Sequence, residues 1–107
     1  EKISNCAAFI FVTPEYNHSY PGVLKNAIDY LWEPWQKKPF IIVSYSPGAI
    51  GGARAAEQLR NLLNWIGLHD CGELNITFAS RQFTPIAGES LGELASRLHK
   101  LFQKLIS

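Results

Sequence analysis

The sequence predicts an α/β fold built around a parallel sheet. Short apolar segments alternate with segments of helical spacing, and the strand–helix pair recurs three times along the 107 residues. Repeated strand–helix pairs form parallel sheets with right-handed crossovers. A chain of this length suits one domain, and we predict a single unit over residues 1–107.

The composition is that of a folded domain, with 47% apolar and 18% charged residues and a net charge of +1. The small net charge gives no electrostatic reason to expect nucleic acid or an anionic membrane as a partner. No apolar stretch approaches the roughly 20 residues that span a bilayer. Cys6 and Cys71 form no Cys-x-x-Cys pair and the histidines show no metal-ligand spacing, so we expect no metal site and two reduced thiols, which fits the cytoplasm.

The first strand is predicted at residues 7–12, where an unbroken apolar run is typical of a strand covered on both faces. A helix is predicted from Pro21 to Trp35. Pro21 suits the first turn of a helix, and apolar residues recur behind it at helical spacing. Pro34 marks the end of this helix, because the residue before a proline disfavours helical backbone.

The middle of the chain repeats the pattern. A second strand is predicted at residues 39–46, a glycine-rich loop at residues 47–52, and a helix at residues 53–66 that Gly67 ends. Residues 74–79 alternate between apolar and polar side chains. They predict a third strand that is less fully buried than the other two.

The end of the chain predicts a loop at residues 80–88, a capping box at residues 90–93 and a leucine-rich helix behind it. Three strands are few for an open α/β sheet, and no helix precedes the first strand. The chain also begins at Glu1 rather than at a methionine. We therefore expect that a preceding strand–helix–strand–helix segment is missing and that the edge of the first strand is exposed.

A polar loop at residues 13–22 is the first candidate for a functional site. It follows the first strand and leads into a helix, and open α/β sheets bind ligands beyond the carboxyl ends of their strands. The residues alone leave an alternative open. This alternative is a helix-entry loop in which Asn17 or Ser19 caps the helix and the tyrosines pack.

Residues 13–31 resemble the signature of the NADPH-dependent FMN reductases, a family that includes azo-, quinone- and chromate-reducing enzymes; they are Thr-Pro-Glu-Tyr-Asn-His-Ser-Tyr-Pro-Gly-Val-Leu-Lys-Asn-Ala-Ile-Asp-Tyr-Leu. Residues 44–54 resemble the second flavin-side loop of that family, and the resemblance covers residues 7–66 well. It implies a flavodoxin-like three-layer sandwich with a parallel sheet that lacks the first two strands and helices. The family's N-terminal loop for the FMN phosphate has no counterpart here.

The resemblance assigns one wall of a flavin site to Pro14, Glu15, Tyr16 and Asn17. It implies that these residues line the isoalloxazine ring, with the backbone amides of residues 15–17 at the polar edge of the ring. Tyr16 would pack beside the ring. The Asn17 side chain would hold the loop or the ring.

The resemblance assigns the second wall to Ser46, Gly48, Gly51 and Gly52. Glycines allow a backbone to approach a flat ring closely. The same residues also suit an ordinary strand-to-helix turn, and both interpretations stay open. The segment matches neither the Gly-x-Gly-x-x-Gly fingerprint nor a Walker loop, so it predicts no phosphate site by itself.

Several other side chains have two interpretations each. His18 faces either the substrate or solvent, and Arg54 meets either a phosphate of NADPH or only water. Lys25 and Asp29 pair within their helix or across a subunit interface. The aromatic residues at the end of that helix form core, interface or a quinone-stacking surface; they are Tyr30, Trp32 and Trp35.

The function that the resemblance implies is an FMN-dependent oxidoreductase that takes hydride from NADPH or NADH and passes electrons to a small-molecule acceptor. No catalytic side chain is expected, because the flavin carries the redox chemistry. The resemblance also implies a homodimer or homotetramer formed through the helix from Pro21 to Trp35. The alternative is a truncated, non-catalytic remnant that acts at most as an oligomerisation module. A one-electron flavodoxin carrier fits less well, since such carriers tend to be acidic and this chain carries +1.

Overall fold

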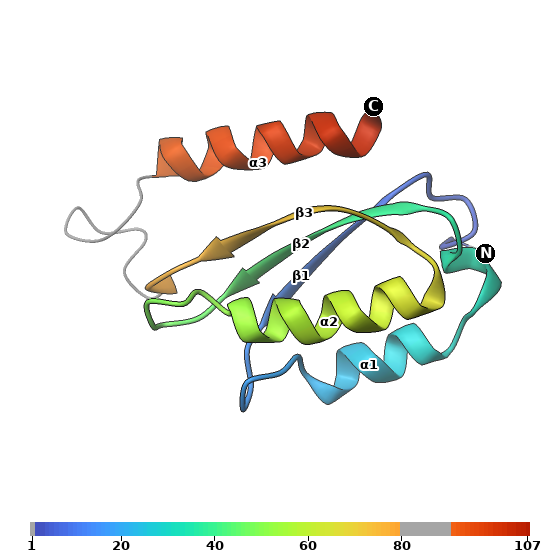
Figure 1. The fold of residues 1–107 in the computed structure, drawn as a ribbon, viewed down its shortest axis with the longest axis horizontal. Coiled ribbons are helices and arrows are strands. Elements are labelled where there is room, and N and C mark those ends of the chain that lie inside the picture. Colours follow the sequence, from blue (N-terminus) through green and yellow to red (C-terminus); the bar gives the residue numbers. More distant parts are fainter. Residues whose placement is uncertain (1, 80–90) are drawn as a thin grey trace.

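The computed structural model describes residues 2–79 and 91–107, and one parallel sheet lies at its centre. The strands are β1 (Phe9–Pro14), β2 (Pro39–Tyr45) and β3 (His69–Ile76), in the spatial order β1-β2-β3. The helices α1 (Gly22–Asp29) and α2 (Ala53–Ile66) lie on one face of the sheet, and α3 (Leu91–Ile106) lies on the other (Figure 1). The predicted α/β class and its layers are confirmed.

β1 is an edge strand with one covered face. Phe9, Phe11 and Thr13 are buried, whereas Ile10 and Val12 are 38% and 61% exposed. The expectation that this strand is covered on both faces is therefore wrong. The physical reason is that, among residues 2–79 and 91–107, α3 packs over β2 and β3 rather than over β1, while α1 and α2 lie on the opposite face.

β2 is the central strand, and its side chains fill both sides of the sheet. Residues 40–44 are all buried. The strand pairs in parallel with both neighbours, so Val43 lies in register with Val12 on one side and with Leu74 on the other. The second predicted strand is confirmed to within one residue.

The helix predicted from Pro21 to Trp35 is wrong in its second half. α1 ends at Asp29, and a separate 3-10 turn, η1 (Glu33–Trp35), follows it. The indole N–H of the buried Trp35 donates to the backbone carbonyl of Ile28 at 2.9 Å. In a longer α-helix that carbonyl would accept a hydrogen bond from the backbone N–H four residues on. Here the Ile28 carbonyl accepts from the indole and, at 3.3 Å, from the N–H of Leu31 three residues on, so the α-helical pattern ends at this point.

α2 agrees with its prediction, and Gly67 ends it in the left-handed conformation, with a φ of +110°. β3 begins earlier than predicted, at residues 69–76 rather than 74–79. Its register shifts opposite Phe40 and Ile42, where Gly72 has a φ of +126°. The first half of the strand carries exposed polar side chains, which an edge strand tolerates, and these hid it from the apolar pattern.

α3 covers the opposite face of the sheet, where Leu94 and Leu105 are buried and Leu94 packs with Val43 and Leu74. The loop predicted at residues 80–88, and Ser90 of the predicted capping box, lie outside the described residues. Within residues 2–79 and 91–107, each helix is too short or too polar to cross a bilayer.

Candidate functional site

The two predicted flavin-side loops leave the sheet next to each other. The first loop (residues 13–22) includes the last two residues of β1 and the first residue of α1, and the second loop (residues 46–52) follows β2. Both lie at the carboxyl ends of the strands (Figure 1). Pro14 lies opposite Tyr45 in the parallel register, and these are the last paired residues of the two strands. The structure therefore places the two segments at the position where open α/β sheets bind ligands.

The tip of the first loop is a tight two-residue turn. Tyr16 and Ser19 exchange backbone hydrogen bonds of 2.8 and 3.0 Å, and Asn17 and His18 between them have φ values of +52° and +63°. Positive φ at both central positions is what a type I′ turn requires, and asparagine is among the residues that adopt it. The amide of Tyr16 is bonded within the turn, while 61% of the Tyr16 residue surface is exposed.

The alternative in which Asn17 or Ser19 caps α1 is wrong. The N-cap of α1 is Pro21, and no side-chain hydrogen bond caps the helix. The packing predicted for the tyrosines holds for Tyr20, which contacts the core, and not for Tyr16. The turn therefore presents its side chains to solvent beyond the end of the sheet.

Glu15 joins the first loop to α2. Its Oε1 accepts a hydrogen bond of 3.0 Å from the backbone N–H of Ala55, in the first turn of the helix. The first N–H groups of a helix have no carbonyl partner within it, and Ala55 is completely buried. A buried donor left without a partner costs about 1–3 kcal/mol. The side chain of Glu15 is thus directed at α2, which the predicted ring contact did not anticipate.

Gly51 and Gly52 bring the second loop into contact with the sheet. Their φ values are +65° and +79°. A Cβ added at Gly51 would lie 2.9 Å from the backbone carbonyl carbon of Ile76, and one added at Gly52 would lie 2.9 Å from the Cβ of Ser44. Both positions therefore require glycine for a steric reason within the protein itself. The strand-to-helix turn is sufficient to explain these two glycines.

Ser46 and Gly48 form the outer part of the second loop. The N–H of Ser46 donates to the carbonyl of Ile76 at 3.3 Å. The carbonyl of Ser46 accepts from the N–H of Ala79 at 2.9 Å. The carbonyl of Gly48 accepts from the Phe78 N–H at 2.8 Å, which ties the loop to the segment after β3. Gly48 is exposed, and a Cβ added there would meet nothing within 4 Å. This part of the loop has open space beside it.

A polar network behind the second loop was not predicted from the sequence. The Ser44 hydroxyl donates to the Gly51 carbonyl at 2.7 Å and accepts from Asn75 Nδ2 at 2.7 Å. Asn75 also donates to Glu73 at 2.9 Å, and Glu73 is ion-paired with Arg60 of α2. Ser44 is fully buried, so its hydroxyl needs these partners. The network holds the Gly51 carbonyl from the side of the sheet.

The polar side chains with two interpretations lie on the surface. His18 and Arg54 are exposed. Lys25 and Asp29 form an ion pair of 2.6 Å along α1, and the Asp29 carboxylate, as hydrogen-bond acceptor, raises the pKa of Lys25. Pairing within the helix is therefore confirmed. In the part of the chain that the structure describes, no three histidine, cysteine or acidic side chains gather as metal ligands would.

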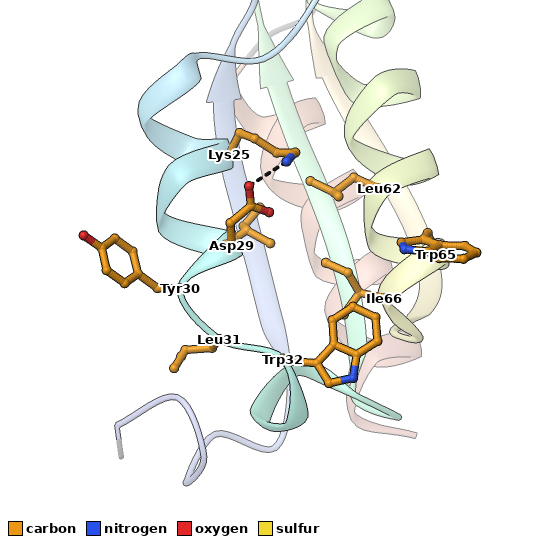
Figure 2. A pocket seen from close by; sticks show the side chains of 9 residues that line it. Lys25, Asp29, Tyr30, Leu31, Trp32, Leu62, Trp65 and Ile66 are labelled. Atoms are coloured by element: carbon orange, nitrogen blue, oxygen red, sulfur yellow. Dashed lines mark hydrogen bonds and ion pairs between the residues drawn. The ribbon is translucent and has the colours of Figure 1, made fainter.

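A groove of about 410 Å³ lies between α1 and α2, away from the two loops (Figure 2). Figure 2 shows the Lys25–Asp29 pair toward one end and Trp32 toward the other. The predicted aromatic cluster is divided, because Trp35 is buried in the core while Trp32 and Tyr30 are 50% and 79% exposed. The groove is lined by Lys25, Ile28, Asp29, Tyr30, Leu31, Trp32, Leu62, Trp65 and Ile66.

Comparison with known proteins supplies the family. The sequence profile of the family described as NADPH-dependent FMN reductase matches residues 1–82, a span that contains both loops. The chain belongs to this family. The match to this FMN reductase family extends beyond the residues that carried the resemblance, through β3 and the segment that follows it.

Two relatives of this chain are an FMN reductase and a quinone reductase. The NAD(P)H-dependent FMN reductase LOT6 of Saccharomyces cerevisiae is 34% identical over 98 residues, which is 92% of this chain and 50% of that protein. A quinone reductase of Pseudomonas putida is 47% identical over 73 residues, which is 64% of this chain and 39% of that protein. The chain thus spans half or less of the length of these relatives.

A solved structure confirms the predicted flavodoxin-like fold. FerB of Paracoccus denitrificans, described as a flavoenzyme NAD(P)H:(acceptor) oxidoreductase, matches with a TM-score of 0.80 and 30% sequence identity. The match covers 98% of this chain and 62% of FerB. Nearly the whole length of the present chain therefore superposes on part of FerB.

Proposed function

We propose that the first and second loops hold the isoalloxazine ring of FMN at the carboxyl edge of the sheet. The observation that carries this proposal is the hydrogen bond between Glu15 and Ala55, because it ties the first loop, next to its exposed turn, to the start of α2, which directly follows the second loop. The residues that would line or shape the ring site are Pro14, Glu15, Tyr16, Asn17, Ser46, Gly48, Gly51 and Gly52.

The described residues fit the ring end of FMN. Tyr16 offers an exposed aromatic surface that can pack beside a flat ring, and the open space at Gly48 leaves room for it. When bound, FMN would supply the chemistry of accepting hydride from NADPH or NADH and passing electrons to an acceptor. The role of the protein chain in this chemistry is to hold the ring, to orient it and to exclude water from one side of it.

We extend the proposal to the activity of the whole protein, which is NAD(P)H-dependent reduction of a small-molecule acceptor of the flavin, quinone or azo type in the cytoplasm. Membership of the FMN reductase family supports this activity, as do relatives named as an FMN reductase and a quinone reductase. The flavin carries the redox step, so the proposal assigns binding roles and no acid–base role to the loop residues.

We also propose that the face formed by α1 and α2 joins two copies of the chain. Large side chains are strongly exposed on this face, with Val23, Tyr30 and Trp65 at 80%, 79% and 80%. Exposed apolar patches of this kind mark interaction sites. The Lys25–Asp29 pair presents both charges on the same face, so a copy related by two-fold symmetry can offer the opposite charge to each.

Titration of the 107-residue chain with FMN tests the ring site. We expect the flavin fluorescence to be quenched on binding and the Tyr16→Ala variant to bind about fivefold more weakly, since one aromatic contact contributes roughly 1 kcal/mol. The loaded protein is then assayed for oxidation of NADPH and of NADH with a quinone as acceptor.

The matched control is Phe102→Ala, which removes a partly exposed aromatic side chain from α3, and it should bind FMN as the unmodified chain does. Absence of flavin binding by the unmodified chain would contradict the proposed site and favour a non-catalytic remnant. Equal weakening in both variants would contradict the role given to Tyr16.

A further inference from the structure

The start of α2 is hydrogen-bonded to two other parts of the chain. The N–H of Ala56 donates to the carbonyl of Gly52 at 3.0 Å, in the helical pattern. The N–H of Ala55, the third residue of α2, has no carbonyl partner within the helix. The carbonyl of Gly51, which lies just before the N-cap Gly52, accepts a hydrogen bond of 2.7 Å from the Ser44 hydroxyl of β2. Ala55 therefore depends on a partner from outside the helix.

Glu15 supplies this partner from a point 40 residues earlier in the sequence. Its position is set on both sides, because Pro14 is the last paired residue of β1 and the hydrogen-bonded turn begins at Tyr16. The contact is partly buried, and Ala55 is completely buried. A change of position at Glu15 would move the turn of the first loop relative to the second loop.

The charge of Glu15 suits the place that its carboxylate occupies. The N-terminus of a helix carries a partial positive charge and exposed N–H donors, so an anion is stabilised there. In this chain the anion is a side chain of the protein itself. This end of α2 is therefore already occupied by a carboxylate and is not where the phosphate of FMN would be held.

We infer that Glu15 is a positioning residue whose carboxylate, bonded to the Ala55 N–H, fixes the spacing between the first and second loops and hence the width of the flavin slot. This inference rests on the proposed function. In this arrangement the backbone around Glu15 lies beside the ring, while the Glu15 side chain holds the first loop to α2. Removing the carboxylate is expected to loosen flavin binding without removing any side chain that touches the ring.

The experiment compares Glu15→Ala and Glu15→Gln with Glu57→Ala, which removes an exposed glutamate from the same helix. The first readout is hydrogen exchange of the Ala55 amide in the ligand-free chain, with global stability measured in parallel by urea unfolding. We expect exchange about tenfold faster in Glu15→Ala and close to the unmodified rate in Glu15→Gln, because glutamine keeps the acceptor oxygen. Glu57→Ala should leave this rate unchanged.

The second readout is the dissociation constant of riboflavin, which has the ring and the ribityl chain of FMN without the phosphate. We expect Glu15→Ala to raise it about tenfold and Glu15→Gln to restore most of the affinity. Unchanged exchange at Ala55 in Glu15→Ala would overturn the inference, because the link would not exist. Faster exchange with unchanged riboflavin affinity would also overturn it, because the link would not position the slot.

Failure of the unmodified chain to bind riboflavin would instead remove the proposed function, and with it the slot that Glu15 is inferred to set. The exchange rates of Ala55 would still decide whether Glu15 joins the loop to the helix. The two failures are therefore distinguishable by which readout changes.

Discussion

At Gly51 the backbone has a φ of +65° and lies so close to β3 that an added Cβ would sit 2.9 Å from the backbone carbonyl carbon of Ile76. Gly48, in the same loop, has open space at the same test position. We predict that Gly51→Ala lowers the free energy of unfolding by at least about 2 kcal/mol, through backbone strain and steric overlap. Gly48→Ala is predicted to stay within about 0.5 kcal/mol of the unmodified chain.

Urea unfolding of the two variants measures this difference directly. Gly48→Ala is the matched control, since it makes the same chemical change in the same loop. Equal loss of stability in the two variants would contradict the steric explanation for Gly51. A Gly48→Ala chain that unfolds normally but binds riboflavin more weakly would agree with a ring placed beside this glycine.

The sequence predicted the strand-to-helix turn of the second loop but not the contacts that its glycines make. Gly51 and Gly52 could be recognised as glycines in a strand-to-helix turn, yet their close neighbours, Ile76 and Ser44, come from different strands. The hydrogen bond between Glu15 and Ala55 likewise joins residues 40 positions apart. Such contacts depend on strand register and on loop path, and no local sequence pattern reports them.

At the scale of the element, α2 was predictable and α1 only in part. The stripe of α2 recurs at helical spacing and ends at a glycine, and both signals are local. The end of α1 depends on the buried indole of Trp35, which bonds to the carbonyl of Ile28. Pro34 suggested an end to the helix, but the point at which the chain leaves it is decided by tertiary packing.

The outer face of α1 and α2 leads to a prediction about assembly. We expect Trp65→Glu to weaken self-association at least tenfold in sedimentation velocity, because it places an unpaired charge within the proposed interface. The folded monomer should be unaffected, since Trp65 is 80% exposed. Phe102→Glu on α3 is the control and should sediment as the unmodified chain does.

A single monomeric species at all concentrations of the unmodified chain would contradict the proposed interface.

The pH dependence of self-association is predicted from the ion pair between Lys25 and Asp29 on this face. Because Asp29 raises the pKa of Lys25, the stabilisation from this pair is present below the ordinary pKa of lysine and is lost only as pH rises through the raised value. Association is therefore expected to be unchanged across the neutral range.

At the scale of the whole molecule, the sheet is covered unevenly. α1 and α2 lie on one face of the sheet, whereas on the other face α3 leaves Ile10 and Val12 of β1 exposed. The alternation of strands and helices was sufficient to predict the class and the parallel sheet, and it is the basis for the candidate site proposed at the carboxyl edge. The uneven covering was not predictable from β1 itself, since an unbroken apolar run looks the same whether one face or two are buried.

The central claim is that the flavin ring lies between the first and second loops at this edge. Amide chemical-shift mapping on addition of riboflavin tests it most directly. The largest changes are predicted at residues 15–17 and 46–52, with little change along the groove between α1 and α2. Changes centred on Trp32 and Trp65, or no changes at all, would contradict the claim.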